Sequence, residues 1–195
     1  MSRVGSADRT TRETRISVEV DLDGSGRSTI HTGIGFFDHM LELLVRNAGL
    51  DAKIDADGDL QVDEHHTVED VGLVLGSALA DALGERRGIR RYGFYVPMDE
   101  ALARVVLDLG GRPFVVFEAD FTREAVGELP TELVEDFVRA LAQTLGANIH
   151  VGVEYGRNDH HRIEAIFKAL GRALRAAIET DPRFEDRIPS TKGVL

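Results

Sequence analysis

A short motif that occurs twice carries the residues best suited to chemistry. The motif reads His-His-x-x-Glu, and its two copies lie 95 residues apart, at His65, His66 and Glu69 and at His160, His161 and Glu164. On a helix, residues three and four positions apart share a face, so each glutamate lies beside both of its histidines. Adjacent histidines point about 100° apart, so one helix can offer ligands to two metal ions. The repeat predicts a duplicated half-unit and a metal centre where the copies meet.

The available ligands are nitrogen and oxygen, because the chain contains no cysteine. Two more histidines, His39 and His150, each precede the doublet in their own half, which gives three imidazoles and one carboxylate per half. This set suffices for two ions with positions left open for substrate or water. It suits Mn, Fe, Co or Ni better than Mg or Ca. His31 has no counterpart, and we interpret it as a structural or surface residue.

Helix geometry also suggests how the ligands divide between two ions. Our hypothesis pairs His66 with Glu69 and His161 with Glu164, each ion being completed by a doublet histidine from the opposite copy. Three aspartates could orient the ligand imidazoles, with helix capping or solvated charge as an equal alternative: Asp38, Asp63 and Asp70.

Composition limits the class of protein. A chain of 195 residues, 43% of them hydrophobic, suits one domain or two half-domains fused through one core. A net charge of −11 argues against a nucleic-acid partner. The polar N-terminus and the lack of a membrane-length apolar run indicate a cytoplasmic protein without a membrane partner.

The elements that position the motifs follow from apolar periodicity. Residues 1–11 are expected to be a disordered lead-in, followed by an opening hairpin of strands over 13–22 and 27–31. Helices are expected over 36–48, ending at Gly49, over 65–83 with Asp63 as cap, after a Thr131 cap, and over 159–179. The remaining strands are expected at 51–56, 60–62, 94–98, 101–109, 113–119 and 148–155.

These elements predict an α+β fold made of two similar fused halves. Each half is expected to be a mostly antiparallel sheet with helices packed on one face. The basic, glycine-bounded segment 84–93 is the expected seam, which gives one half over residues 1–92 and a second over 93–195.

At this point the sequence closely resembles the imidazoleglycerol-phosphate dehydratases, a family of histidine-biosynthesis enzymes. The matching stretches run in the family's order from about residue 12 to the end: TGIGFFDHM (32–40), DEHHTVED (63–70), MDEAL (98–102), GRP (111–113), NDHHRIE (158–164), FKA (167–169) and PSTKG (189–193). The resemblance implies a dehydration of D-erythro-imidazole-glycerol phosphate to imidazole-acetol phosphate. It also implies two Mn²⁺ per active site and a homo-oligomeric shell of 24 subunits with sites at subunit interfaces.

The resemblance also carries residue roles onto this chain. It implies eight metal ligands: His39, His65, His66, Glu69, His150, His160, His161 and Glu164. It implies four residues that hold the substrate phosphate: Arg91, Arg112, Ser190 and Lys192. Glu13 matches a family glutamate close to the substrate.

The residues are chemically suited to that reaction. Two metals on the two ring nitrogens would stabilise an imidazolate, whose electrons could expel the neighbouring hydroxyl. Glu13, Glu69 and Glu164 are candidate proton carriers, and the sequence does not choose among them. Two alternatives remain open, a dinuclear metallohydrolase and a non-catalytic metal-binding shell.

Overall fold

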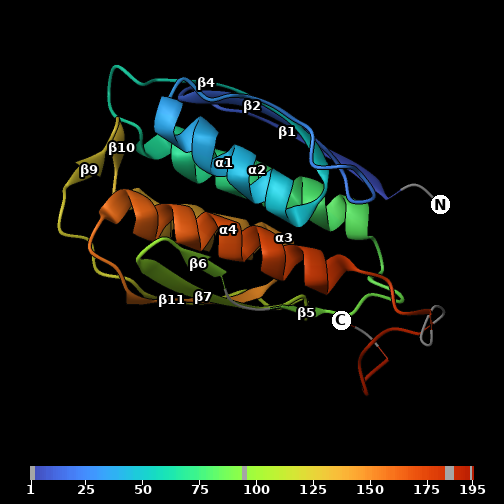
Figure 1. Cartoon of the computed structure of the whole chain (residues 1–195). Helices are drawn as coiled ribbons and strands as arrows, with labels where there is room; N and C mark the ends of the chain where they lie inside the picture. The colour runs from blue at the N-terminus through green and yellow to red at the C-terminus, as the bar shows by residue number, and fades with distance from the viewer. Residues whose placement is uncertain (1–2, 94–95, 183–186, 194) are drawn as a thin grey trace.

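Four helices lie between two β-sheets in the computed structural model (Figure 1), which describes all residues except 1–2, 94–95, 183–186 and 194. The first sheet has the order β1 (Val4–Thr10), β2 (Thr14–Asp21), β4 (Asp51–Gly58), β3 (Ser28–His31). The second has the order β5 (Tyr92–Gly93), β7 (Ala101–Asp108), β11 (Asn148–Tyr155), β8 (Phe114–Glu118), and β6 (Val96–Met98) also pairs with β7. A small separate pair joins β9 (Ala125–Val126) to β10 (Leu129–Pro130).

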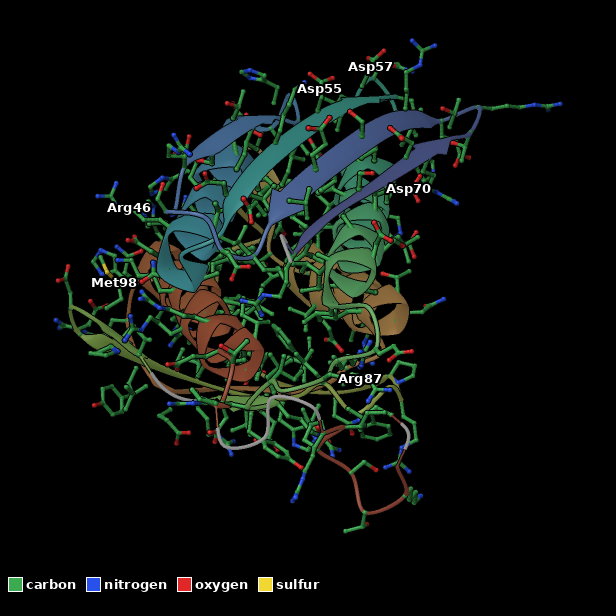
Figure 2. All side chains as sticks on the ribbon, turned by 90° about the vertical axis from the view of Figure 1, so that its right-hand side faces the viewer. Arg46, Asp55, Asp57, Asp70, Arg87 and Met98 are labelled. Atoms are coloured by element: carbon green, nitrogen blue, oxygen red, sulfur yellow. The ribbon has the colours of Figure 1, made fainter. Side chains whose placement is uncertain are left out.

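The two large sheets share one topology. In each, two antiparallel central strands are followed by an outer strand that runs parallel to its neighbour, β3 beside β4 and β8 beside β11. Each sheet has helices on its inner face only, and the side chains of Asp55 and Asp57 project from the outer face of the first (Figure 2). The predicted α+β class with two similar halves is therefore confirmed. The boundary between residues 92 and 93 remains a prediction, and it falls within β5.

The helices pair across the halves. The first half supplies α1 (Gly35–Ala48) and α2 (His65–Leu83), and the second supplies α3 (Leu133–Leu145) and α4 (Asp159–Ile178). Gly76 lets α2 approach α3 closely, because a Cβ there would lie 2.6 Å from the Leu141 carbonyl oxygen. At the equivalent position of the repeat, a Cβ on Gly171 would lie 2.5 Å from the Leu44 carbonyl oxygen of α1. The pairs are thus α2 with α3 and α1 with α4.

Residues Val4–Thr10 form a strand, contrary to the predicted disordered lead-in. Strand β1 pairs antiparallel with β2 along its whole length. Its buried Gly5 fits against α2, where a Cβ would lie 2.3 Å from the Ala78 carbonyl oxygen. The sequence did not predict this strand because β1 is an edge strand with few apolar side chains. Backbone pairing with β2 holds it in place.

Three further local predictions were wrong. The opening hairpin does not form, because β4 lies between β2 and β3. Residues 60–62 form a turn, in which the Val62 amide donates to the Asp59 carbonyl at 2.7 Å. The Thr131 hydroxyl does not cap α3 and instead donates to the Arg123 carbonyl at 2.8 Å.

Other predicted features agree with the structure. Strand β2 alternates as expected, with Ile16, Val18 and Val20 buried against the helices. Helix α1 ends at Gly49, whose φ of 72° is readily available to glycine. Within the described ranges, none of the helices combines the length and apolar content that crossing a bilayer requires.

Candidate metal centre and phosphate cavity

One cluster of candidate ligands forms at the start of α4. The side chain of Asn158 caps this helix by accepting a hydrogen bond from the His160 amide at 3.0 Å. One turn later, Glu164 places a carboxylate oxygen 3.3 Å from Nε2 of His160. His39 reaches the same place from α1, so that three ligand atoms lie within 4.8 Å of one another. This separation and the nitrogen and oxygen donor set fit a single transition-metal ion.

Glu164 is held in its ionised form. Its side chain is buried, and Lys168, one turn further along α4, approaches it with an Nζ to Oε1 distance of 2.6 Å. Burial raises the pKa of Glu164, but the hydrogen bond and positive charge of Lys168 outweigh it, so the pKa lies below its usual value. A charged carboxylate is the form that binds a metal.

A second, looser cluster forms at the start of α2. The carboxylate of Asp63 accepts a hydrogen bond from the His65 amide at 3.0 Å, but the N-cap residue of α2 is Glu64 and not the predicted Asp63. Nε2 of His65 lies 3.9 Å from the Glu69 carboxylate. Asp136 of α3 lies 3.8 Å from the other ring nitrogen of His65. Asp136 was not among the predicted site residues, because an acidic residue in the first turn of a helix is common and does not indicate a binding site.

The side chains do not match the hypothesis that paired each glutamate with the second histidine. In both halves the glutamate approaches the first histidine, four positions earlier, which favours the pairs His65 with Glu69 and His160 with Glu164. The reason is that the ring nitrogens of the second histidines turn toward carboxylates from other segments, Asp59 and Glu100. Both spacings are compatible with a helix, so sequence spacing alone could not separate them.

The hydrogen bonds between the second histidines and these carboxylates shift the pKa of both histidines and of Glu100. The hydrogen bond to Asp59 raises the pKa of His66, and the hydrogen bond to Glu100 raises the pKa of His161. In return, the bond from His161, followed by those from the backbone amides of Asn158 and Arg157, lowers the pKa of Glu100 to about 2. Glu100 is therefore an anion throughout the physiological pH range.

The three aspartates proposed as orienting groups have structural roles. Asp38 accepts hydrogen bonds from the amide and hydroxyl of Thr32 at the start of α1. Asp63 precedes the N-cap residue Glu64 and accepts a hydrogen bond from the His65 amide in the first turn of α2. Asp70 is buried between α2 and the first sheet (Figure 2), where it accepts bonds from Thr14 at 2.5 Å and Arg9 at 2.8 Å. All three therefore make structural hydrogen bonds at or near the helices, and none of them is a helix N-cap residue.

His150 lies apart from both clusters within one chain. On β11 its neighbours Ile149 and Val151 are buried on the helix side, while His150 is exposed on the opposite face. His39 and His150 are therefore not equivalent members of the repeat, since one lies on a helix and the other on a strand. His31 is exposed on β3.

The four predicted phosphate residues line one cavity of about 1280 Å³. Arg91, Arg112, Ser190 and Lys192 line it together with two further arginines, Arg90 and Arg187. Arg91 pairs with Asp108 and donates from Nη1 to the Pro189 carbonyl at 2.9 Å, which ties the C-terminal segment to the cavity wall. Such a concentration of cations in an acidic protein suits a phosphate dianion.

Glu13 does not lie in this cavity. It directly precedes β2, is about half exposed, and places its carboxylate 3.8 Å from Nε2 of His66. The structure therefore brings Glu13 to the end of the molecule that carries the metal motif of α2.

The two clusters of candidate ligands lie at the starts of α2 and α4, whereas the cavity is lined by β5 and the C-terminal segment, and Figure 1 shows these segments at opposite ends of the helix layer. His160 is in the first turn of α4, whereas Arg91 donates to the carbonyl of Ala177 in its last turn at 2.7 Å. At a rise of 1.5 Å per residue, these positions are about 26 Å apart along the helix axis. A small substrate cannot span this distance within one chain.

Comparison with known proteins supports the same identification. The family model for "Imidazoleglycerol-phosphate dehydratase" matches residues 32–174. An imidazoleglycerol-phosphate dehydratase of Clostridium botulinum (strain Langeland) is 56% identical over 188 residues, which is 96% of this chain and 95% of that protein. One from Xanthobacter autotrophicus is 57% identical over the same shares. The histidine biosynthesis bifunctional protein HisB of Spirosoma linguale is 50% identical over all of this chain and 50% of that protein.

Solved structures agree with the sequence matches. The imidazoleglycerol-phosphate dehydratase of Staphylococcus aureus superposes with a TM-score of 0.82 at 41% identity, covering 91% of this chain and 99% of that one. The Pyrococcus furiosus enzyme in complex with (S)-C348 gives 0.84 at 38% identity, with 97% and 100% covered. On these matches, the chain belongs to the imidazoleglycerol-phosphate dehydratase family and is a hydro-lyase.

Proposed function

We propose that this chain removes water from D-erythro-imidazole-glycerol phosphate to give imidazole-acetol phosphate, as a step of histidine biosynthesis. The observation that carries the proposal is the convergence of His39, His160 and Glu164 within 4.8 Å in a member of this family. The cationic cavity supplies the second requirement, a binding place for the phosphate group of the substrate.

Two manganese ions per active site fit the donors that the chain offers. His39, His160 and Glu164 would hold one ion, while His65 and Glu69 would contribute to the other, with His66, His161 and His150 as the remaining proposed ligands. When bound, such ions are Lewis acids that let the imidazole ring of the substrate carry negative charge. The loose second cluster and the outward position of His150 both call for ligands from another subunit.

The protein's own side chains would bind the phosphate and move a proton. Arg112 and Lys192 are exposed in the cavity and free to turn toward a phosphate dianion, and Ser190 adds a hydroxyl donor. Glu164 is engaged by Lys168, which supports a ligand role for it. Glu13 is about half exposed and is not among the proposed ligands, so its carboxylate is left to carry the proton from the ring carbon.

A complete site is proposed to form between subunits. The separation of about 26 Å along α4 means that the metal end of one chain must meet the cavity of another. A closed homo-oligomer, which we propose to contain 24 subunits in the cytoplasm, provides such a repeated contact. No nucleic acid or membrane partner is part of this proposal.

The products of the reaction distinguish this function from its alternatives. Manganese-loaded protein is incubated with the substrate, and the keto product is followed by mass spectrometry together with release of inorganic phosphate. The dehydratase gives imidazole-acetol phosphate and no free phosphate, whereas phosphate release without the keto product would establish a metallohydrolase.

A variant of the cavity separates catalysis from metal storage. Lys192→Ala is expected to retain its manganese and to raise KM at least tenfold, because one charge-assisted hydrogen bond is worth roughly 1.5–3 kcal/mol. Lys53→Ala on the exposed face of β4 is the matched control. An unchanged KM for Lys192→Ala would contradict the phosphate assignment, and a lack of any turnover in the wild type would favour a storage shell.

A further inference from the structure

The second histidine of each doublet is held by a carboxylate that the established family activity does not explain. Nδ1 of His161 lies 2.7 Å from the Glu100 carboxylate. Nδ1 of His66 lies 3.1 and 3.2 Å from the two oxygens of Asp59. All four side chains are partly buried, which protects these hydrogen bonds from competition by water.

The two halves make this contact from different parts of their sheets. Asp59 follows β4, and its amide donates to the Glu13 carbonyl at 3.0 Å. Glu100 precedes β7, at the tip of the β6–β7 hairpin. The equivalent strands β4 and β11 begin at Asp51 and Asn148, a shift of 97 residues, so the counterpart of Asp59 is Gly156, which has no side chain. The contact in the second half is therefore made by a residue from a different position.

The contact has a defined chemical consequence. A carboxylate that accepts a hydrogen bond from Nδ1 fixes the neutral imidazole with its proton on that nitrogen. The lone pair then lies on Nε2, which becomes the ligand atom, and its basicity rises. In both halves Nε2 faces a further carboxylate, Glu13 at 3.8 Å from His66 and Asp99 at 3.9 Å from His161. The two ligand nitrogens thus point into equally acidic surroundings that attract a cation.

We propose that Asp59 and Glu100 are positioning residues that orient His66 and His161 so that Nε2 of each binds the metal centre. This inference rests on the proposed function, which places manganese at the two histidine doublets. It is tested by the affinity for Mn²⁺, which can be measured without measuring turnover.

The variants Asp59→Asn and Glu100→Gln test the role with little change in shape. In Glu100→Gln, the amide oxygen can still accept the hydrogen bonds that Arg157 and Asn158 donate to Oε1 at 3.1 and 2.9 Å. The new amide NH₂ faces Nδ1 of His161, which must then accept, so the ring proton moves to Nε2 and blocks the ligand lone pair. Each variant is expected to bind Mn²⁺ 10-fold to 100-fold more weakly, measured by isothermal titration calorimetry on the assembled, metal-stripped protein.

Glu42→Gln is the matched control. Its carboxylate lies 3.9 Å from Nδ1 of His39, too far for a hydrogen bond, so the affinity is expected to change less than twofold. Glu100→Asp keeps the carboxylate and is expected to bind Mn²⁺ more tightly than Glu100→Gln. The melting temperature of the metal-free variants shows whether they are folded.

Two results would separate failure of this inference from failure of the proposed function. Wild-type Mn²⁺ affinity in folded Asp59→Asn and Glu100→Gln would overturn the positioning role even if the enzyme is a dehydratase. Weakened binding in both variants, with Glu42→Gln unchanged, would support it even if the substrate were a different phosphorylated imidazole.

Discussion

Lys168 and Glu164 form a close ion pair one helical turn apart, with 2.6 Å between Nζ and Oε1. Because Glu164 is buried, removal of its cation leaves a carboxylate with poor solvation. We expect Lys168→Met to lower the free energy of unfolding of the metal-free protein by about 2 kcal/mol. Added Mn²⁺ should stabilise this variant more than the wild type, since the ion supplies the missing positive charge.

Urea unfolding with and without Mn²⁺ measures both effects. Lys53→Met, on the exposed face of β4, is the control for loss of a lysine and should change stability by less than 0.5 kcal/mol, roughly the limit for a surface substitution. If Mn²⁺ stabilises Lys168→Met and the wild type equally, Glu164 does not contact the ion.

The separation of metal clusters and cavity predicts complementation between subunits. At substrate concentrations well below the wild-type KM, His160→Ala and Lys192→Ala chains, each alone, should have little activity, because every site then lacks a candidate metal ligand or a phosphate-binding lysine. Co-expressed chains should regain roughly a quarter of wild-type activity if assembly is random and each site joins two chains. Steady-state turnover of the purified mixed assembly measures this, and no recovery would show that both ends of a site come from one chain.

Acid stability depends on Asp51 in the first sheet. Hydrogen bonds from the backbone amides of Ser25 and Arg27, and then from the Arg27 side chain, hold the pKa of Asp51 well below its usual 3.8. A carboxyl whose pKa is lower when folded stabilises the protein above the unfolded pKa, and this contribution is lost as pH falls toward the folded pKa. Asp51→Asn should therefore be less stable than the wild type at pH 7, with the difference shrinking below about pH 4.

Thermal unfolding between pH 2.5 and 7 is the measurement for Asp51→Asn. Asp55→Asn, on the outer face of the same strand (Figure 2), is the control. A stability difference that persists unchanged at the lowest pH would show that packing, rather than charge, explains the effect of the Asp51 substitution.

Close helix packing predicts a cost for a single methyl group. A Cβ at Gly76 would lie 2.1 Å from the Thr144 hydroxyl and 2.6 Å from the Leu141 carbonyl, so Gly76→Ala must push α2 away from α3. We expect a loss of about 2 kcal/mol in chemical denaturation. Gly35→Ala is the control, because the nearest atom to its Cβ would be 3.8 Å away. Equal stability of Gly76→Ala and the wild type would contradict this packing.

Much of the fold was predictable because buried faces of helices and strands give regular spacings of apolar residues in the sequence. Helices α1, α2 and α4 agree with their predicted spans, since their apolar faces repeat at helical spacing. Strand β1 was not predicted, because only Gly5 in it is fully buried. The opening hairpin was wrong because local sequence does not record which distant strand inserts between two neighbours.

The candidate residues of the site could be nominated from the sequence, but their contacts could not. His39, His160 and Glu164 lie close together because α1 packs against α4, which the repeat itself does not specify. Glu100 belongs to the MDEAL stretch, yet its contact with His161 depends on a hairpin that places it beside a residue 61 positions later in the chain. Contacts between residues far apart in the sequence cannot be predicted from the spacing of residues within one element.

The exchange of helices between the halves has a consequence for the origin of the chain. His39 comes from the first half and its partners His160 and Glu164 from the second, so an ancestral half-length polypeptide could have built this cluster only by pairing with a twin. Gene fusion would then have turned a bimolecular encounter into an intramolecular one at high effective concentration. Gly76 and Gly171, which occupy equivalent positions of the repeat, would then mark the two helix crossings of that early dimer.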